Sequence, residues 1–311
     1  DNLFNSKQSV VGRIEKITGK PCPFIKCDLL DEGKLDEVFE RNKFDAVIHF
    51  AGLKAVGESC ENPLLYYYNN VVGTVNLCNA MKKYNVSRIV FSSSACVYGN
   101  DARPPISETA VLNPANPYGR TKKVIEEMLR DLTKADENLT VISLRYFNPI
   151  GAHESGLIGE EPNNTPNNIA PILLDVLTGR RKEFSIFGGD YDTADGTGVR
   201  DYVDVRDLAA GHILSLEKVK RTGFHVYNLG TGKGVSVLEL LHSFEAASGR
   251  KIPYKITPRR SGDVDTYFAD CGKAQAELDF QTKYNIKDMC QSMWKFAEKN
   301  LGKEEDADED F

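Results

Sequence analysis

Short apolar runs alternate with longer amphipathic stretches along the first two-thirds of the chain. A run of apolar and β-branched residues predicts a strand, and apolar residues repeating every three or four positions predict a helix. The predicted strands are Phe24–Asp28, Asp45–Gly52, Arg88–Ser94 and Val141–Tyr146, and the predicted helices include Leu35–Phe39, Leu64–Tyr84 and Pro117–Lys134. Because strand and helix alternate, the pattern predicts an α/β fold with a doubly wound parallel sheet, right-handed crossovers and helices on both faces.

The pattern changes after the predicted strand Val141–Tyr146. Residues 151–198 are rich in Gly, Pro and Asn, which predicts loops around one short helix. The elements predicted from here on are helices at Pro171–Thr178, Asp204–Glu217 and Val237–Ala247, and a strand at Val226–Leu229. The acidic run Glu304–Asp310 is expected to lie in solvent.

Composition narrows the class of protein. The 311 residues, 41% hydrophobic and 27% charged, can bury a large core, which excludes a disordered chain. A net charge of −6 argues against nucleic acid or an anionic membrane as a partner. The chain has no run of ~18 apolar residues, and its first residues lack a signal-peptide pattern. Seven cysteines without zinc-ligand spacing indicate reduced thiols, no metal site and a cytoplasmic protein.

Four polar clusters follow predicted strands. They are Asp28, Gly52 with Lys54, Ser92–Ser94 and Tyr146–Asn148. Ligands of open parallel sheets bind beyond the carboxyl ends of the strands. We therefore expect all four clusters to line one ligand-binding edge.

The motif Tyr118-Gly119-Arg120-Thr121-Lys122 places a phenol and an ammonium on one face of a predicted helix. A nearby cation lowers the pKa of a phenol, which can then take a proton from an alcohol at neutral pH. The alternative is an ordinary solvated pair, since about one such spacing is expected by chance among 13 tyrosines. The hydroxyls of Ser92–Ser94 favour catalysis, because they can supply a hydrogen bond to the reacting oxygen.

Ser94, Tyr118 and Lys122 resemble the Ser and Tyr-x-x-x-Lys triad of the extended short-chain dehydrogenase/reductase family. The surrounding sequence is similar to the UDP-glucose (UDP-galactose) 4-epimerases of that family. The matching segments are His49-Phe50-Ala51-Gly52-Leu53-Lys54-Ala55-Val56-Gly57-Glu58-Ser59, Asn116-Pro117-Tyr118-Gly119, Leu144-Arg145-Tyr146-Phe147-Asn148-Pro149, Asp195-Gly196-Thr197-Gly198-Val199-Arg200-Asp201-Tyr202 and Tyr227-Asn228-Leu229-Gly230. They run in order along most of the chain.

The resemblance implies a Rossmann-like sheet, a smaller α/β substrate-binding domain and a bound NAD. The residues that it implies for NAD are Asp1, Asn2, Asn5, Ser6, Asp28, Leu29, Phe50, Ala51, Gly52, Lys54, Asn69, Ser94, Tyr118, Lys122 and Phe147. Asp1 would hold the adenosine ribose and favour NAD over NADP, because its charge repels a 2′-phosphate.

The same resemblance implies UDP-glucose and UDP-galactose as substrates, interconverted by transient NAD-dependent oxidation at C4 of the hexose. The implied substrate contacts are Lys54, Ser94, Tyr118, Asn148, Asn168, Ile169, Phe187, Arg200, Arg260, Asp263 and Tyr267. Two arginines suit a diphosphate, although Arg259 is adjacent to Arg260 and either can take that role. A tyrosine at position 267 implies a preference for these sugars over their N-acetyl counterparts.

The implied domains are residues 1–148 with a returning segment at about 199–230 for NAD, and 149–198 with 231–302 for the sugar nucleotide, followed by an acidic tail at 303–311. The family also implies a homodimer. Family members open with a strand, a glycine-rich turn and a helix of ~30 residues before an Asp-Asn, whereas this sequence opens at Asp1-Asn2. On that basis we expect the first strand and helix to be missing and the chain to bind NAD poorly.

Two alternatives remain at this level. The dehydratases of the family need an acid-base pair after the strand-end hydroxyl, typically Asp-Glu, where this chain has Ala95-Cys96. A non-catalytic or inactive sugar-nucleotide-binding fragment would also explain the absence of a glycine-rich turn near the N-terminus.

Overall fold

A four-stranded parallel sheet forms the centre of the molecule. The computed structural model describes residues 1–163, 166, 168–260 and 262–300. The sheet consists of β1 (Val47–His49), β2 (Arg88–Ser94), β3 (Thr140–Tyr146) and β8 (Gly223–Leu229), in the order β1-β2-β3-β8. All neighbouring strands are parallel, and Ser94, Tyr146 and Leu229 lie side by side at the carboxyl edge. The predicted parallel sheet is therefore confirmed.

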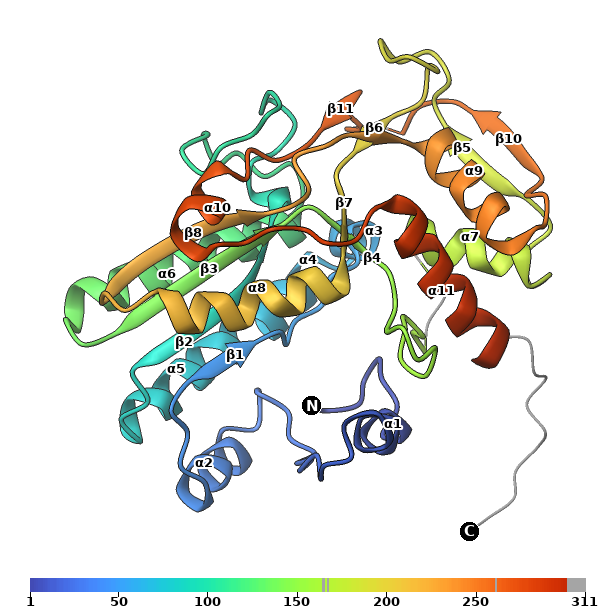
Figure 1. Ribbon diagram of the computed structural model, residues 1–311. Helices are drawn as coiled ribbons and strands as arrows, with labels where there is room; N and C mark the ends of the chain where they lie inside the picture. The colour runs from blue at the N-terminus through green and yellow to red at the C-terminus, as the bar shows by residue number, and fades with distance from the viewer. Residues whose placement is uncertain (164–165, 167, 261, 301–311) are drawn as a thin grey trace.

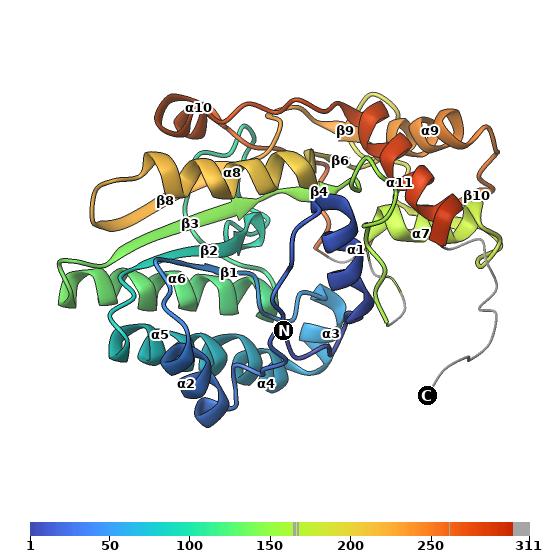
Figure 2. The ribbon, with the colours of Figure 1, turned by 60° about the horizontal axis from the view of Figure 1, so that its bottom comes forward.

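Helices cover both faces of this sheet, as Figures 1 and 2 show. Helices α5 (Gly73–Lys83) and α6 (Pro117–Ala135) lie on one face, and α8 (Val205–Lys218) and α10 (Gly272–Leu278) lie on the other. Side chains alternate along β2, so that Ile89 and Phe91 pack with Ile125 of α6, while Val90 packs with Leu208 of α8. Burial on both faces explains the apolar run Ile89–Phe91 at the centre of β2.

A second hydrophobic core lies beside the sheet. It is shared by α7 (Ile169–Leu177), α9 (Val237–Ser248), α11 (Ile286–Asn300) and β5 (Phe184–Phe187), which pairs with β10 (Tyr254–Thr257). Short strands link this part to the sheet: β4 (Asn148–Ile150) pairs with β7 (Tyr202–Asp204), and β6 (Val199–Arg200) pairs with β9 (Val235–Ser236) and β11 (Thr266–Tyr267). The division into two domains agrees with these cores and stays a prediction.

The N-terminal segment differs from the prediction. Helices α1 (Ser9–Thr18) and α2 (Glu32–Arg41) form, but Phe24–Asp28 is not a strand, so that prediction is wrong. The Cys27 amide donates a hydrogen bond to the Asp1 carbonyl. A strand needs a neighbouring ladder, and that bond does not extend into one here. Helix α1 instead lies against the loop that follows β4, where Lys7 and Arg13 pair with Glu161 (Figure 2).

The remaining predicted elements form with small changes in their ends. The helix predicted over Leu64–Tyr84 is divided into α4 (Pro63–Tyr66), a π-helical turn at Tyr67–Val72, and α5. Helix α3 (Val56–Glu61) precedes it. Within the described residues, no helix is long and apolar enough to cross a membrane. The acidic run 304–310 lies outside the described residues.

Candidate active site

The fold brings Ser94, Tyr118 and Lys122 to one end of the sheet. Ser94 ends β2, and Tyr118 and Lys122 occupy the first two turns of α6. Pro117 and the capping side chain of Asn116, which accepts from the Gly119 amide at 2.8 Å, determine where that helix begins. The Lys122 Nζ lies 5.9 Å from the centre of the Tyr118 ring.

The Lys122 ammonium is fixed by the strand beneath it. Its Nζ donates a hydrogen bond of 2.7 Å to the carbonyl of Ser92. Burial lowers the pKa of Lys122 to about 8, against opposing effects from Glu126 and Cys96. The Lys122 ammonium therefore lies beside the Tyr118 phenol and has a pKa only slightly above neutral pH.

The pKa of Tyr118 does not follow the prediction. Burial raises the pKa of the phenol above its ordinary value, the Cys96 thiol raises it further, and the Ser94 hydroxyl lowers it. The expected lowering of the Tyr118 pKa is therefore not found in this structure, because desolvation sets the direction of the shift. The Tyr118 phenol is neutral here.

Glu126 supports this arrangement and was not predicted from the sequence. One turn after Lys122, its buried carboxylate accepts hydrogen bonds from Ser93 of β2 at 2.6 Å and from Ser143 of β3 at 2.8 Å. The guanidinium of Arg145 donates to both of its oxygens, at 2.9 and 2.6 Å. Glu126 thus ties α6 to the two strands beside Ser94. A charged residue on the apolar face of α6 is the sequence feature that could have indicated Glu126.

Two more buried groups fix the start of α6. The Ser59 Oγ of α3 accepts a hydrogen bond of 3.2 Å from the Tyr118 amide, one of the free amides of the first turn. The Asn70 side chain accepts from the Leu53 amide at 2.7 Å and donates to the Thr121 hydroxyl at 3.2 Å. Sequence reasoning missed both, because polar residues at these positions are also typical of solvated helices.

The residues predicted to hold the adenosine part of NAD gather at the N-terminus. The Asp1 carboxylate accepts from the Leu3 amide at 2.6 Å and from the Ser6 hydroxyl at 3.0 Å, and the Asn2 side chain donates to Asp28 at 2.8 Å. Asp28 thus joins the predicted cluster through a loop and not at the end of a strand. Asn5 accepts from the Asn163 amide, and the Leu29 carbonyl accepts from Asn76.

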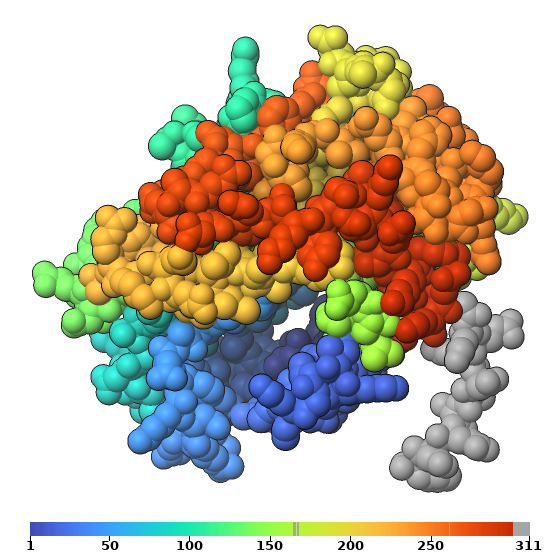
Figure 3. Space-filling model, in the orientation of Figure 1, coloured from blue at the N-terminus to red at the C-terminus, as the bar shows by residue number. Residues whose placement is uncertain are grey.

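The predicted cofactor groove continues at the end of β1. Phe50 is 59% exposed, an unusual state for a large apolar side chain directly after a strand, and its ring lies 4.6 Å from that of His212 on α8. Figure 3 shows the molecular surface hollowed between the blue N-terminal residues and the yellow helix α8. Ala51 and Gly52 follow Phe50 in the loop that leads to Lys54.

Glu160 connects the two sides of the predicted site and was also missed. It accepts from the Lys54 ammonium and from the Asn168 side chain, both at 2.8 Å. Asn168 directly precedes Ile169, where α7 begins, and its side chain makes no capping hydrogen bond to that helix. Asn69, in the π-helical turn, donates to the Asn70 side chain. The contact of Glu160 crosses a long stretch of sequence, so no local pattern indicates it.

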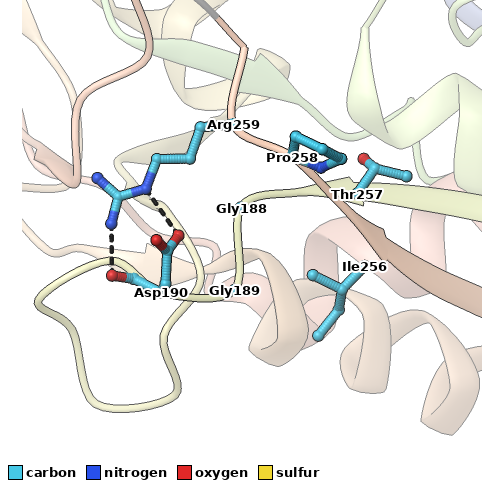
Figure 4. A pocket seen from close by; sticks show the side chains of 7 residues that line it. All are labelled: Gly188, Gly189, Asp190, Ile256, Thr257, Pro258 and Arg259. Carbon is cyan, nitrogen blue, oxygen red and sulfur yellow. Dashed lines mark hydrogen bonds and ion pairs between the residues drawn. The ribbon is translucent and has the colours of Figure 1, made fainter.

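The structure distinguishes the two adjacent arginines. Arg260 pairs with Asp263 at 2.9 Å and lies 4.7 Å above the Phe187 ring, so three predicted substrate residues come together. Arg259 instead donates hydrogen bonds to the side chain and to the backbone carbonyl of Asp190 (Figure 4). Both residues lie beside an open pocket that is lined by Gly188, Gly189, Ile256, Thr257 and Pro258. Arg260 therefore remains the candidate for the diphosphate.

The remaining substrate candidates join the triad to this group. Phe147 and Tyr267 pack with ring centres 5.7 Å apart, and the Tyr267 hydroxyl donates to the Ala95 carbonyl. The backbone amide of Asn148 donates to the backbone carbonyl of Asp201, the residue after Arg200 of β6. The side chain of Arg200 donates to the Val199 carbonyl at 2.8 Å.

The position that dehydratases use for an acid-base pair has no such pair here. Ala95 and Cys96 form a tight turn, in which the Cys96 amide donates to the Ser94 Oγ at 3.2 Å. Burial raises the pKa of the Cys96 thiol, so it stays protonated. The turn after Ser94 therefore offers no acid-base pair.

Comparison with known proteins agrees with this geometry. Residues 1–230 match the NAD dependent epimerase/dehydratase family. The UDP-glucose 4-epimerase of Bacillus subtilis (strain 168) is 52% identical over 302 residues, which cover 97% of this chain and 89% of that enzyme.

Two solved structures have the same fold. One is UDP-glucose 4-epimerase from Bifidobacterium longum in complex with NAD+ and UDP, which is 48% identical with a TM-score of 0.93, over 97% of this chain and 90% of that one. The other is the Stenotrophomonas maltophila UDP-glucose-4-epimerase with bound NAD and formylated UDP-arabinopyranose, which is 45% identical with a TM-score of 0.93, over 96% and 89% of the two chains.

Proposed function

The chain belongs to the NAD dependent epimerase/dehydratase family, and we propose that it is an isomerase that interconverts UDP-glucose and UDP-galactose. The observation that carries this function is the convergence of Ser94, Tyr118 and Lys122 at the carboxyl edge of the sheet, in a chain about half identical to enzymes of that activity. The reaction inverts one carbinol centre, C4 of the hexose, through a transient ketone.

The residues at the sheet edge fit NAD as the cofactor. The Asp1 carboxylate suits the adenosine ribose hydroxyls, Asp28 would flank the adenine, and exposed Phe50 offers an apolar wall. Lys122 and Tyr118 would hold the nicotinamide ribose at the other end. When bound, NAD supplies a two-electron oxidant that is regenerated at the end of each cycle.

Within this site, Tyr118 acts as the general base and then as the general acid. We assign it the proton of the 4-hydroxyl, which passes to the phenolate oxygen as the C4 ketone forms and returns to the opposite epimer. The Lys122 ammonium, fixed by the Ser92 carbonyl at 2.7 Å, stabilises the negative charge on that oxygen. Ser94 donates a hydrogen bond to the reacting oxygen.

The UDP part of the substrate binds to residues other than the catalytic Ser94, Tyr118 and Lys122. Arg200 and Arg260 offer guanidinium groups for the diphosphate, and Phe187, 42% exposed at the end of β5, offers a stacking face for the base. Asn148, Asn168, Ile169 and Asp263 complete the proposed contacts. Anchoring at UDP leaves the hexose free to present either face to Tyr118.

The experiment that tests this function is an equilibrium assay on the full-length protein with added NAD. UDP-galactose should be converted to UDP-glucose until both are present, with no loss of water and no net NADH. A dehydrated 4-keto-6-deoxy product would contradict the assignment. A homodimer stays a prediction from the family resemblance, and a cytoplasmic location stays a prediction from the cysteine content.

A further inference from the structure

The hydroxyl of Tyr191 is a buried polar group without a partner. Tyr191 is 6% exposed, and its Oη finds no hydrogen bond among the residues that the structure describes. Leaving a buried hydroxyl unsatisfied destabilises a protein, and such groups are rare in native structures. If the Tyr191 side chain only filled space, phenylalanine could replace it without a loss of stability.

The loop around Tyr191 is built to hold its ring in place. A Cβ on Gly188 would lie 2.3 Å from the ring, so glycine is required there, and Gly188 also has a positive φ of 85°. The guanidinium of Arg259 covers the ring at 4.1 Å, and Asp190 fixes that guanidinium through its side chain (Figure 4). The Tyr191 amide donates to the Gly196 carbonyl at 2.9 Å.

The charges around the phenol are those of the proposed diphosphate site. The Arg259 guanidinium lies 4.1 Å from the centre of the Tyr191 ring, and the next residue, Arg260, lies 4.7 Å from the ring of Phe187, directly before Gly188. Burial raises the pKa of Tyr191, as does Asp263, whereas Arg200, Arg259 and Arg260 lower it. Arg200 and Arg260 are the two guanidinium groups assigned to the diphosphate, and Arg259, which pairs with Asp190, covers the Tyr191 ring. The Tyr191 hydroxyl therefore has no acceptor among the described residues, and arginine side chains lie around it.

We infer that Tyr191 is a substrate-binding residue whose hydroxyl donates a hydrogen bond to an anionic oxygen of the nucleotide diphosphate. This inference rests on the proposed function and extends it by one contact that the family motifs do not include. A phenol can donate one hydrogen bond, and a phosphate oxygen beside two arginines is the acceptor that the site supplies. Binding would then satisfy the group that the free protein leaves unpaired.

The test compares Tyr191→Phe with Tyr254→Phe, a matched control that removes an exposed phenol from the neighbouring strand β10. Calorimetric titration of the full-length proteins with UDP should show affinity about tenfold weaker in Tyr191→Phe and unchanged in the control. Titration with uridine, which has no phosphate, should show less than about a twofold difference between Tyr191→Phe and the wild type. Thermal unfolding without ligand should give the same midpoint or a higher one, because the variant removes an unpaired hydroxyl.

The outcomes are distinct. Equal UDP affinity in wild type and Tyr191→Phe would overturn this assignment and leave the proposed function intact. An equal loss with UDP and with uridine would overturn the diphosphate as the acceptor. A lower unfolding midpoint without ligand would show that the hydroxyl has an internal partner, which also overturns the inference. Failure of the wild type to bind UDP would instead overturn the proposed function itself.

Discussion

The Tyr267 hydroxyl donates a hydrogen bond of 2.8 Å to the backbone carbonyl of Ala95, the residue that follows Ser94. This bond fixes the phenol ring against the end of the catalytic strand, where it also packs on Phe147. Burial raises the pKa of Tyr267, so the phenol stays a neutral donor. Tyr267 therefore occupies space beside the reacting centre as a fixed side chain.

This relationship predicts the sugar preference. A 2-acetamido group is several heavy atoms larger than a hydroxyl, and forcing it into a packed wall costs about 1–3 kcal/mol. We expect kcat/KM for UDP-galactose to exceed that for UDP-N-acetylgalactosamine by at least ~10-fold, and Tyr267→Cys to remove most of that difference. Tyr267→Phe, which keeps the ring, is the matched control and should retain the preference. Equal use of both sugars by the wild type would exclude Tyr267 from this role.

The separation of the two adjacent arginines predicts different effects on UDP binding. Arg260→Gln should weaken UDP by at least ~10-fold, since it removes a guanidinium assigned to the diphosphate. It should leave uridine binding nearly unchanged, which calorimetry can measure. Arg259→Gln should act less on UDP, because Arg259 lies with Asp190, whereas Arg260 lies with the predicted substrate residues Phe187 and Asp263. The reverse order of effects would assign the diphosphate contact to Arg259.

The buried pair of Glu126 and Arg145 predicts a large loss of stability. Glu126→Gln leaves the buried guanidinium without a charged partner and should lower the free energy of unfolding by about 3 kcal/mol. The neighbouring Glu127, whose side chain is 54% exposed, provides the control. Glu127→Gln should change the unfolding free energy by less than about 0.5 kcal/mol in the same denaturant titration. Similar midpoints for the two variants would show that Glu126 does not hold α6 on the sheet.

The lowered pKa of Lys122 predicts how stability depends on pH. The folded state releases this proton at about pH 8 and the unfolded chain near its ordinary 10.5. Below pH 8 the folded protein must bury an ammonium, so Lys122→Met should be more stable than wild type there, by about 3 kcal/mol before the loss of the Ser92 bond is counted. As pH rises from 8 towards 10.5 the wild type gains stability relative to the variant, and the difference should close.

The control for this titration is Lys123→Met on the same helix. The side chain of Lys123 is 33% exposed and lies 3.8 Å from Glu127. Its variant should differ from wild type by only a small amount, because the Lys123 side chain is not buried. A difference for Lys122→Met that is constant between pH 7 and 10.5 would contradict the lowered pKa.

The sequence predicts the central sheet well because its inner strands, β2 and β3, are buried on both faces. Runs such as Arg88–Ser94 then carry the signal without knowledge of their neighbours, and the helix that starts at Pro117 is marked by its own cap. The segment Phe24–Asp28 has a similar composition but does not form a strand. Strand formation depends on hydrogen bonds from another segment, which local sequence does not report.

The same limit applies to the site. Ser94, Tyr118 and Lys122 stand in motifs with fixed spacing, so they could be predicted. The bridge from Lys54 through Glu160 to Asn168 joins parts of the chain that are far apart in sequence. The raised pKa of Tyr118 also could not be predicted from the sequence. The spacing of Tyr118 and Lys122 indicates a neighbouring cation, but it does not indicate how deeply the phenol is buried.

The most direct test of the account is the turnover of Tyr118→Phe in the full-length protein. Phenylalanine keeps the ring and removes the one oxygen assigned to proton transfer. Epimerisation of UDP-galactose should fall by at least ~10²-fold, the lower range for general acid-base catalysis. The affinity for UDP, measured by calorimetry on the same preparation, should stay within about twofold of the wild type, because the diphosphate site lies on other elements. Retention of most of the wild-type turnover with intact UDP binding would contradict the assignment of Tyr118 as the catalytic base.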